Sequence, residues 1–349
     1  MNEKTLFDRK SLESFIAQKW NDSIIPELCE FIQIPNLSPV FDREWKKNGY
    51  MDQAVKLVAD WCQNQKIKGL SLKIEELEGR TPLLFIEVAG SGKCSEETIL
   101  FYGHLDKQPE MEGWDHDKGP WKPVLRADKL YGRGGGDDGY AVYTAVTVIK
   151  ALQEQGIPHA RCVIIIESCE ESGSFDLPFY IDSLRNRIGI PDLVVCLDSG
   201  CGNYDQLWLT TSLRGIAMGE IRVDLLKEGI HSGNGSGVIA SSFRVLRKLL
   251  NRIEDVDTGE IKVKDLYAEI PPIRLEQAEK VADVIGSDFA NSFPLLDGVE
   301  TVSSDPIDLI LNRTWRPSLS VIAADGLPKP GKAGNVLRPM TSMVISIRL

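Results

Sequence analysis

The stretch Glu97–Glu110, ETILFYGHLDKQPE, joins a strand-like apolar run to a pair of polar side chains. Its segment Thr98–Tyr102 is apolar and partly β-branched, which is typical of a buried strand. His104 and Asp106 come directly after a glycine and are one residue apart, so in an extended chain both leave on one face. The stretch therefore predicts a core strand that presents an imidazole and a carboxylate at its carboxyl end.

Strand and helix patterns alternate on both sides of this stretch. The apolar runs are continuous rather than alternating, which indicates a mostly parallel sheet with helices on both faces. We expect an α/β domain over residues 1–212. Strands are expected near 72–74, 83–88, 98–102, 160–167 and 192–197, and helices at 11–33, at 51–65 and for about 15 residues from Asp137.

The pattern changes after residue 212 to half-buried, alternating strands and further helices. A chain of 349 residues also exceeds one ordinary core, so two domains are expected. We predict that residues 213–349 form a second, α+β domain. Its helices are expected at 238–253 and 274–285, and its later strands at 318–323 and 340–348.

Composition excludes several classes of protein. A net charge of -11 argues against binding to nucleic acid or to an anionic membrane surface, since both need clustered Lys and Arg. The apolar runs are far shorter than the roughly 18 residues of a membrane helix. The N-terminal residues 1–10 are of mixed charge and lack the apolar core of a signal peptide. Seven cysteines without a CxxC pair indicate free thiols, as in the cytoplasm.

Acidic side chains and a histidine recur at four strand or loop ends of the first domain. They are His104 and Asp106, Asp137 and Asp138, Glu170 and Glu171, and Asp198. Ligands of open α/β sheets bind at the carboxyl ends of the strands, so these groups are expected to meet. Several buried carboxylates repel one another unless a cation lies between them. Mixed His and carboxylate ligands suit Zn²⁺, Mn²⁺ or Co²⁺, and this many carboxylates suggests two ions about 3.5–4 Å apart.

Each signal also has a plainer interpretation. A histidine and an aspartate at a strand end can form an ordinary hydrogen-bonded turn. Asp138 is placed to cap a helix N-terminus, Glu170 and Glu171 can form a solvated surface, and Asp198 can be a turn former. The joint occurrence of the four signals, each after an apolar strand or a glycine loop, favours the metal site.

Longer motifs then relate the chain to a known family. They are YGHLDKQP, GWDHDKGPWKPVLRADKLYGRGGGDDG, ESCEESGS, VVCLDSG, GIHSGNGSG and GNVLRPMTSMVISIRL. Together they resemble the M20 family of metallopeptidases, in the branch of cytosolic dipeptidases related to carnosine dipeptidases. The resemblance implies a zinc-peptidase-like catalytic domain, a lid domain that also forms a dimer, and two divalent ions, of which zinc is the first expectation.

Roles of individual residues follow from the resemblance. His104 and Asp198 are similar to ligands of one ion, Asp137 to the bridging carboxylate and Glu171 to a ligand of the other ion. Asp106 is similar to the acid that orients His104, and Glu170 to the general base.

Three residues of the second domain resemble substrate-binding groups of the family. His231 is similar to a residue that reaches the neighbouring subunit and stabilises the oxyanion. Asn335 and Arg348 are similar to substrate contacts, and Arg348 would bind the substrate carboxylate. From the residues alone, His231 and Asn335 are also interpretable as turn residues and Arg348 as an exposed strand arginine.

The chain departs from the family pattern at two kinds of position. The resemblance predicts a further metal-binding histidine in a returning C-terminal segment, but the chain ends at SMVISIRL and contains four histidines. We therefore expect a C-terminally incomplete chain, which alone can be inactive. The sequence DDGY also lacks the lysine that usually follows the second aspartate, and the proline of NVLRP stands one place late.

The predicted function is hydrolysis of dipeptides or small peptides with a free carboxylate by a cytoplasmic enzyme. Two alternatives stay open, which are an N-acyl-amino-acid deacylase of the same family and a non-catalytic protein that keeps the fold. A glycosidase with paired carboxylates explains fewer of the residues, because it requires no histidine at the strand end.

Overall fold

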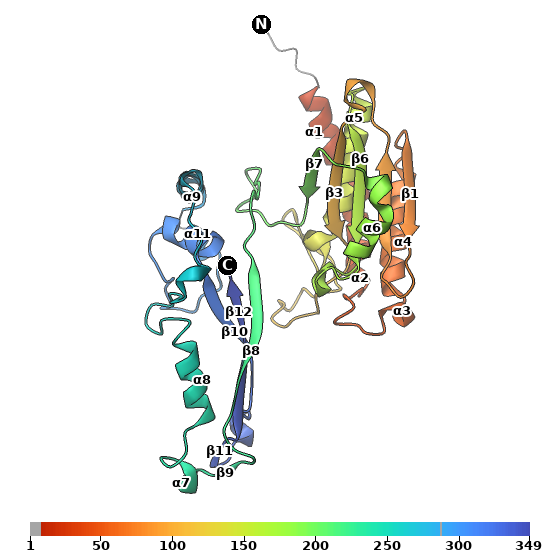
Figure 1. Ribbon diagram of the computed structural model, residues 1–349. Coiled ribbons are helices and arrows are strands. Elements are labelled where there is room, and N and C mark those ends of the chain that lie inside the picture. Colours follow the sequence, from red (N-terminus) through yellow and green to blue (C-terminus); the bar gives the residue numbers. More distant parts are fainter. Residues whose placement is uncertain (1–7, 287) are drawn as a thin grey trace. The chain divides into compact units, whose positions relative to one another are not determined.

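The computed structural model describes residues 8–286 and 288–349, which form two compact units, Met1–Gly200 and Cys201–Leu349. Each unit is described by itself (Figure 1). The division falls earlier than the boundary that the sequence suggested at residue 212. Residues 1–7, which carry most of the signal-peptide argument, lie outside the described residues. Within the described ranges, no helix is long and apolar enough to cross a membrane.

The first unit is built on a five-stranded sheet in the order β1-β2-β6-β3-β7. Strands β6, β3 and β7 are parallel, whereas β2 is antiparallel to both β1 and β6. The sheet is therefore mixed, with four strands in one direction, and the α/β fold class is confirmed. The strands are β1 (Leu70–Glu75), β2 (Leu83–Val88), β3 (Thr98–His104), β6 (Arg161–Glu167) and β7 (Leu193–Cys196).

Helices cover both faces of this sheet. The helices are α1 (Arg9–Lys19), α2 (Ile25–Gln33), α3 (Trp45–Asn48), α4 (Tyr50–Asn64), α5 (Tyr140–Glu154) and α6 (Leu177–Ile188). One face, which carries Ile86 and Ile164, packs against α2, α4 and α5. The other face, which carries Phe85 and Val163, packs against α6. Because successive strand residues point to opposite faces, the continuous apolar runs supply both cores.

Two expected elements differ from the structure. The helix expected over 11–33 is interrupted by a short π-helical segment, Trp20–Ile24, that precedes Pro26. Strand β7 is an edge strand whose Leu193 and Val194 are about half exposed, so it is not the core strand that its apolar sequence suggested. A hairpin, β4 (Val124–Arg126) with β5 (Lys129–Tyr131), lies between β3 and α5 in the chain.

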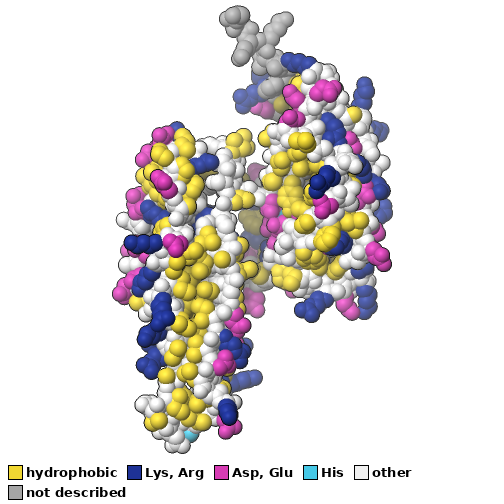
Figure 2. Space-filling view, viewed as in Figure 1, with side chains coloured by type: hydrophobic (Ala, Val, Ile, Leu, Met, Phe, Trp, Pro, Cys, Tyr) yellow, Lys and Arg dark blue, Asp and Glu magenta, His cyan; other side chains and the backbone are white. Residues whose placement is uncertain are grey.

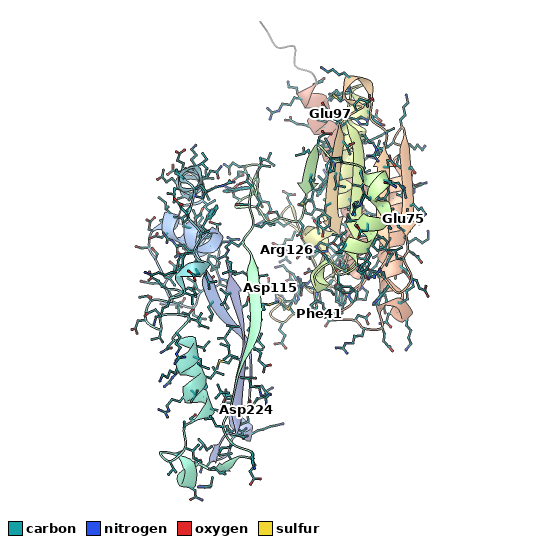
Figure 3. The ribbon with its side chains drawn as sticks, in the orientation of Figure 1. Phe41, Glu75, Glu97, Asp115, Arg126 and Asp224 are labelled. Carbon is teal, nitrogen blue, oxygen red and sulfur yellow. The ribbon has the colours of Figure 1, made fainter. Side chains whose placement is uncertain are left out.

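The segment before Phe41 lies at the carboxyl end of β3. Figure 3 shows Glu97, which precedes β3, at one end of the first unit and Phe41 at the other. The backbone N–H of Ser38 bonds to the carbonyl of Lys107, which places the segment before Phe41 beside the loop that follows β3. The carboxyl ends of β3 and β6 lie next to each other, because His104 pairs with Glu167.

The second unit contains an antiparallel sheet in the order β10-β12-β8 and a two-stranded ribbon of β9 and β11. Helix α8 packs on the sheet through the buried Leu246 and through a 2.8 Å hydrogen bond between Ser242 and Thr341. Figure 2 shows apolar side chains along this part of the unit. The elements are β8 (Ile216–Asp224), β9 (Ile230–His231), α7 (Ser232–Gly235), α8 (Ser242–Leu250), α9 (Pro272–Ile285), α10 (Asp288–Asn291), α11 (Pro306–Thr314), β10 (Ser318–Asp325), β11 (Val336–Leu337) and β12 (Met340–Arg348).

Candidate metal centre

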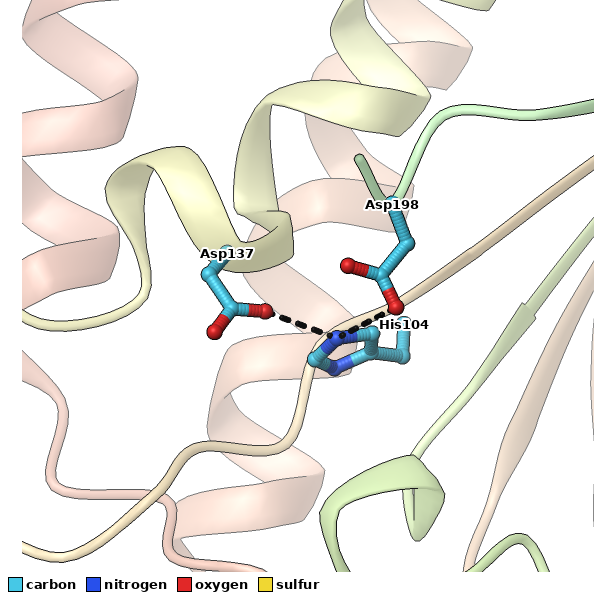
Figure 4. Close-up of side chains that lie close together, drawn as sticks. All are labelled: His104, Asp137 and Asp198. Atoms are coloured by element: carbon cyan, nitrogen blue, oxygen red, sulfur yellow. Dashed lines mark hydrogen bonds and ion pairs between the residues drawn. The ribbon is translucent and has the colours of Figure 1, made fainter. Parts of the chain in front are cut away.

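His104 is the last residue of β3, and its side chain is fully buried. Its Nε2 lies 3.2 Å from Oδ1 of Asp137 and 3.7 Å from Oδ2 of Asp198 (Figure 4). Oε2 of Glu170 lies 3.9 Å from the same nitrogen. Three carboxylates, two from residues that follow strands and one from the turn before α5, therefore approach the same nitrogen of the imidazole.

The other ring nitrogen of His104 is oriented by Asp106. Nδ1 lies 3.1 Å from the backbone carbonyl of Asp106, to which it can only donate, and 3.5 Å from the carboxylate Oδ1. With the proton on Nδ1, the neutral imidazole directs the lone pair of Nε2 toward the carboxylate cluster. The backbone carbonyl of Asp106 thus lies closer to Nδ1 of His104 than its carboxylate does, and the carboxylate also binds other groups.

The carboxylate of Asp106 holds the turn that follows β6. Its Oδ1 accepts the backbone N–H of Glu170 and its Oδ2 accepts that of Glu171, each at 3.0 Å. Asp106 is fully buried, so these charge-assisted hydrogen bonds are shielded from water. The side chain of Glu171 is held in turn by the amide of Gln108. Asp106 and Gln108 thus connect the loop after β3 to both glutamates.

Asp137 and Asp138 lie in a turn, Gly135–Gly139, that precedes α5, and the peptide bond between them is cis. Their backbone is not helical, and α5 begins at Tyr140. The interpretation of Asp138 as a helix N-cap is therefore wrong. Its buried carboxylate instead accepts the backbone N–H of His104 at 3.2 Å, which ties this turn to the end of β3.

The pKa values at this site show that the carboxylates create a strongly negative field. Burial and neighbouring acids raise the pKa of Glu170 to about 7 and that of Asp138 to about 8. Burial alone would lower the pKa of His104, but its contacts with Asp106 and Asp137 raise it to about 11. Without another cation the cluster thus keeps a proton on this buried imidazole, so the site is favourable for positive charge.

Two groups of potential metal ligands meet at His104. In the first, ligand atoms of His104, Asp137 and Asp198 all lie within 4.8 Å of one another, and in the second those of His104, Glu170 and Glu171 do. Buried oxygens of Asp138 and Glu171 have no hydrogen-bond partner, which is costly unless a further group satisfies them. A nitrogen ligand with several carboxylate oxygens fits a divalent transition metal. The residues present therefore fit a divalent metal ion.

The three sequence-predicted residues of the second unit form two separate groups. His231 pairs with Val336 across the ribbon of β9 and β11, and the N–H of Ser232 bonds to the carbonyl of Asn335 at 2.8 Å. Arg348 is the last residue of β12 and pairs with Ile216. His231, Asn335 and Arg348 are all exposed.

Comparison with known proteins identifies the family. Residues 100–285, more than half of the chain, match the family described as Peptidase family M20/M25/M40. The chain belongs to this family. The matched region contains all four predicted metal ligands, from His104 at the end of β3 to Asp198, two residues after β7.

Relatives in the M20 family include named dipeptidases. The chain is 30% identical to human Beta-Ala-His dipeptidase over 251 residues, which cover 67% of this chain and 46% of that protein. It is 29% identical to a Cys-Gly metallodipeptidase of Candida albicans over 261 residues, which cover 73% of this chain and 53% of the relative. The chain thus spans about half the length of the curated relatives it matches.

Solved structures of the M20 family show the same fold. Human carnosine dipeptidase 1 matches with a TM-score of 0.67 and 20% identity, over 97% of this chain and 72% of that one. An M20 family metallo-carboxypeptidase from Sulfolobus solfataricus matches with a TM-score of 0.69 and 19% identity, over 92% and 70% of the two chains. These likenesses establish the architecture of the M20 chain described here.

Sequence reasoning missed several residues that build the M20 site. Gln108 follows His104 and Asp106 in the same motif. Its position two residues after Asp106 is the sequence signal that could have indicated its contact with Glu171. Ser38 bonds to Ser172 at 2.5 Å and so links the segment after α2 to the turn of Glu170 and Glu171. Nothing in the local sequence of Ser38 indicates this contact, because its partner is 134 residues away.

Proposed function

We propose that this chain is part of a hydrolase that cleaves the amide bond of dipeptides or small peptides with a free carboxylate. The observation that carries the proposal is the convergence of Asp137, Asp198 and Glu170 on Nε2 of His104. The names of the M20 relatives support peptide substrates. In this proposal residues 1–212 form the catalytic domain and residues 213–349 the lid and dimerisation domain.

The proposed cofactors are two divalent ions, zinc first and manganese or cobalt as alternatives. His104 and Asp198 would hold one ion, Glu171 the other, and Asp137 would bridge them. When bound, such ions lower the pKa of water and so supply hydroxide near neutral pH. The negative field around His104 and the close approach of these carboxylates support the assignment.

Glu170 is the proposed general base. Its carboxylate lies beside the imidazole of His104, and its pKa of about 7 suits a group that takes up and releases a proton near neutral pH. In the reaction it would accept a proton from the attacking water and donate it to the leaving amine. Asp106 would keep Glu170 in place, because it binds the backbone of that residue.

We propose that His231 stabilises the oxyanion in the active site of a neighbouring subunit, that Asn335 is a further substrate contact, and that Arg348 binds the substrate carboxylate. The places of these residues support two separate sites of action, because His231 and Asn335 belong to the ribbon of β9 and β11 whereas Arg348 is the last residue of β12. The ribbon of His231 follows β8 at Asp224, which pairs with Met340, whereas Arg348 is eight residues further along β12. At about 3.3 Å per residue, the two ends of the strand are roughly 26 Å apart.

The proposed assembly is a homodimer through the second unit, in the cytoplasm. Strand β8 pairs with β12 alone within the described sheet, so its nine residues present a free edge to which another strand can bond. All seven cysteines are free thiols, which supports a reducing compartment.

Metal analysis together with substrate hydrolysis tests the proposed function. The metal-loaded full-length protein should hydrolyse a dipeptide such as Cys-Gly, and Glu170→Gln in it should lose more than about 100-fold in turnover while it retains metal. Asp137→Asn should lose metal. Cleavage of N-acetyl amino acids but not of dipeptides would favour the deacylase. A full-length protein that binds metal but cleaves neither class would favour the non-catalytic alternative.

A further inference from the structure

Lys107 has a fully buried side chain although it is a lysine. Its Nζ donates to the backbone carbonyls of Phe31 at 2.7 Å and of Ile34 at 2.8 Å, and it lies 3.9 Å from the centre of the Phe31 ring. In the described part of the chain no carboxylate forms an ion pair with it. A buried lysine without an anionic partner is costly, so its place in the fold calls for a structural reason.

The two carbonyls that accept from Lys107 belong to the end of α2. The last carbonyls of a helix have no partner within the helix, and a donor or cation is favourable there. Lys107 supplies this donor from a position more than 70 residues further along the chain. Its amine therefore fixes the end of α2 relative to the loop that follows β3.

The backbone of Lys107 is held from the same side. Its N–H bonds to the carbonyl of Asn36 at 3.1 Å, and its carbonyl accepts the N–H of Ser38 at 3.0 Å. The side chain of Asn36 also donates to the carbonyl of Leu105 at 2.8 Å. Both the backbone and the side chain of Lys107 thus attach the loop of His104 and Asp106 to the segment that follows α2.

The turn that carries Asp137 rests on the other side of Lys107. A Cβ atom on Gly134 would lie 2.4 Å from Cε of Lys107, and Gly134 has a φ of +83°. A Cβ atom on Gly139 would lie 2.5 Å from the Phe31 ring. The turn from Gly134 to Gly139 therefore packs directly on Lys107 and on the aromatic ring beneath its amine.

We propose that Lys107 is a positioning residue of the metal centre. Its side chain holds α2, the loop after β3 and the turn of Asp137 together, and so sets the distance between the ligand atoms of His104 and Asp137. The inference rests on the proposed function only in requiring that these residues bind metal. It does not depend on the charge of the amine, because a neutral amine still has two N–H groups for the two carbonyls.

Metal affinity of the full chain is the decisive measurement. Zn²⁺ and Mn²⁺ are titrated against a competing chelator, at a temperature where circular dichroism shows every variant to be folded. Lys107→Met removes the donor and keeps the length of the side chain, and it should weaken metal binding by about 10- to 100-fold, the range seen for residues that support metal ligands. Lys107→Gln keeps an N–H donor on a shorter side chain and should give a smaller loss.

Val88→Ala is the matched control. Val88 is fully buried at the end of β2 that pairs with Cys162, away from the strand ends that carry His104 and Glu167. Its truncation should lower the melting temperature without a change in metal affinity. If Lys107→Met and Lys107→Gln bind metal as the wild type does, and only their melting temperatures fall, the inference is wrong. If the wild type binds metal but cleaves no peptide, the proposed function fails and the comparison of affinities still decides the role of Lys107.

Discussion

Oδ1 of Asp106 accepts the backbone N–H of Glu170 at 3.0 Å, so the loop after one strand fixes the turn after its neighbour. The second oxygen makes the same contact with Glu171. The two residues that the sequence presents as an adjacent acidic pair are therefore held by a third acid. Its carboxylate thus positions the backbone of both glutamates beside His104.

Asp106→Asn should weaken both stability and metal binding, because an amide offers one acceptor where the carboxylate offers two. Hydrogen bonds to charged groups contribute about 1.5–3 kcal/mol each, so the free energy of unfolding should fall by about 2 kcal/mol or more. Urea unfolding in the presence of a chelator measures this loss. Asp60→Asn, at an exposed acid that pairs with Lys56, is the control and should change stability by less than about 0.5 kcal/mol. Equal effects of the two substitutions would contradict the assigned role of Asp106.

The metal-free protein should lose stability as the pH rises. Burial and neighbouring acids raise the pKa of Glu170 to about 7 and of Asp138 to about 8, so the folded state binds more protons than the unfolded state between about pH 4 and pH 8. The contribution of these groups to the free energy of unfolding is complete at low pH and is lost as the pH rises through these values. Urea unfolding at pH 5 and at pH 8, with chelator and with saturating Zn²⁺, measures it. An equally steep fall in both series would argue against a metal site here.

Lys107 should give the opposite dependence on pH. Burial lowers its pKa to about 6, so between about pH 6 and pH 10 the folded state binds fewer protons at this amine than the unfolded state does. Its contribution is present at high pH and is lost as the pH falls toward 6. With chelator present throughout, the free energy of unfolding of the wild type minus that of Lys107→Met should therefore increase with pH over this range. Parallel curves for the two proteins would show that the amine has an ordinary pKa in the fold.

The glycine-rich turn offers a matched pair of substitutions. A Cβ atom at Gly139 would lie 2.5 Å from the Phe31 ring and 2.6 Å from the carbonyl oxygen of Gly134, whereas one at Gly136 would meet no atom within 4 Å. Gly139→Ala should therefore cost about 1–3 kcal/mol of stability through overpacking, and Gly136→Ala should be nearly neutral. Thermal unfolding of both variants checks the difference. A neutral Gly139→Ala would mean that the ring of Phe31 can move aside.

The packing at Gly139 bears on the lysine that the resemblance predicts after the second aspartate. Phe31 and the carbonyl of Gly134 leave no room for a side chain at this position. The sequence shows that the lysine is missing but not this packing, because Phe31 is more than 100 residues away in the chain.

The sequence predicted the elements that carry the site better than the contacts that hold it. The strand that ends at His104 and the strand Arg161–Glu167 follow from local apolar runs, which depend on neighbours in the chain. The antiparallel direction of β2 has no local signal, since its apolar run would serve equally in either direction. The clustering of His104, Asp137 and Asp198 is present, and their roles, with those of Glu170, His231, Asn335 and Arg348, stay predictions.

Contacts between distant segments account for what was missed. A capping aspartate and Asp138 look alike in sequence, and only the partner of Asp138, the backbone of His104, distinguishes them. Asn36 and Ser38 lie in a loop whose sequence suggests only a turn, and nothing in the motif of Lys107 indicates that its side chain binds the end of α2. Their contacts depend on how α2 returns to the sheet.

The pairing of His104 with Glu167 closes the ladder between β3 and β6, and this makes ligand placement a matter of strand alignment. A slip by one residue would exchange the two faces of β3 and turn the imidazole away from its carboxylates. Chains that misalign these strands during folding would thus lose the metal site as well as the packing of the sheet. Metal affinity would therefore report whether β3 and β6 are correctly aligned.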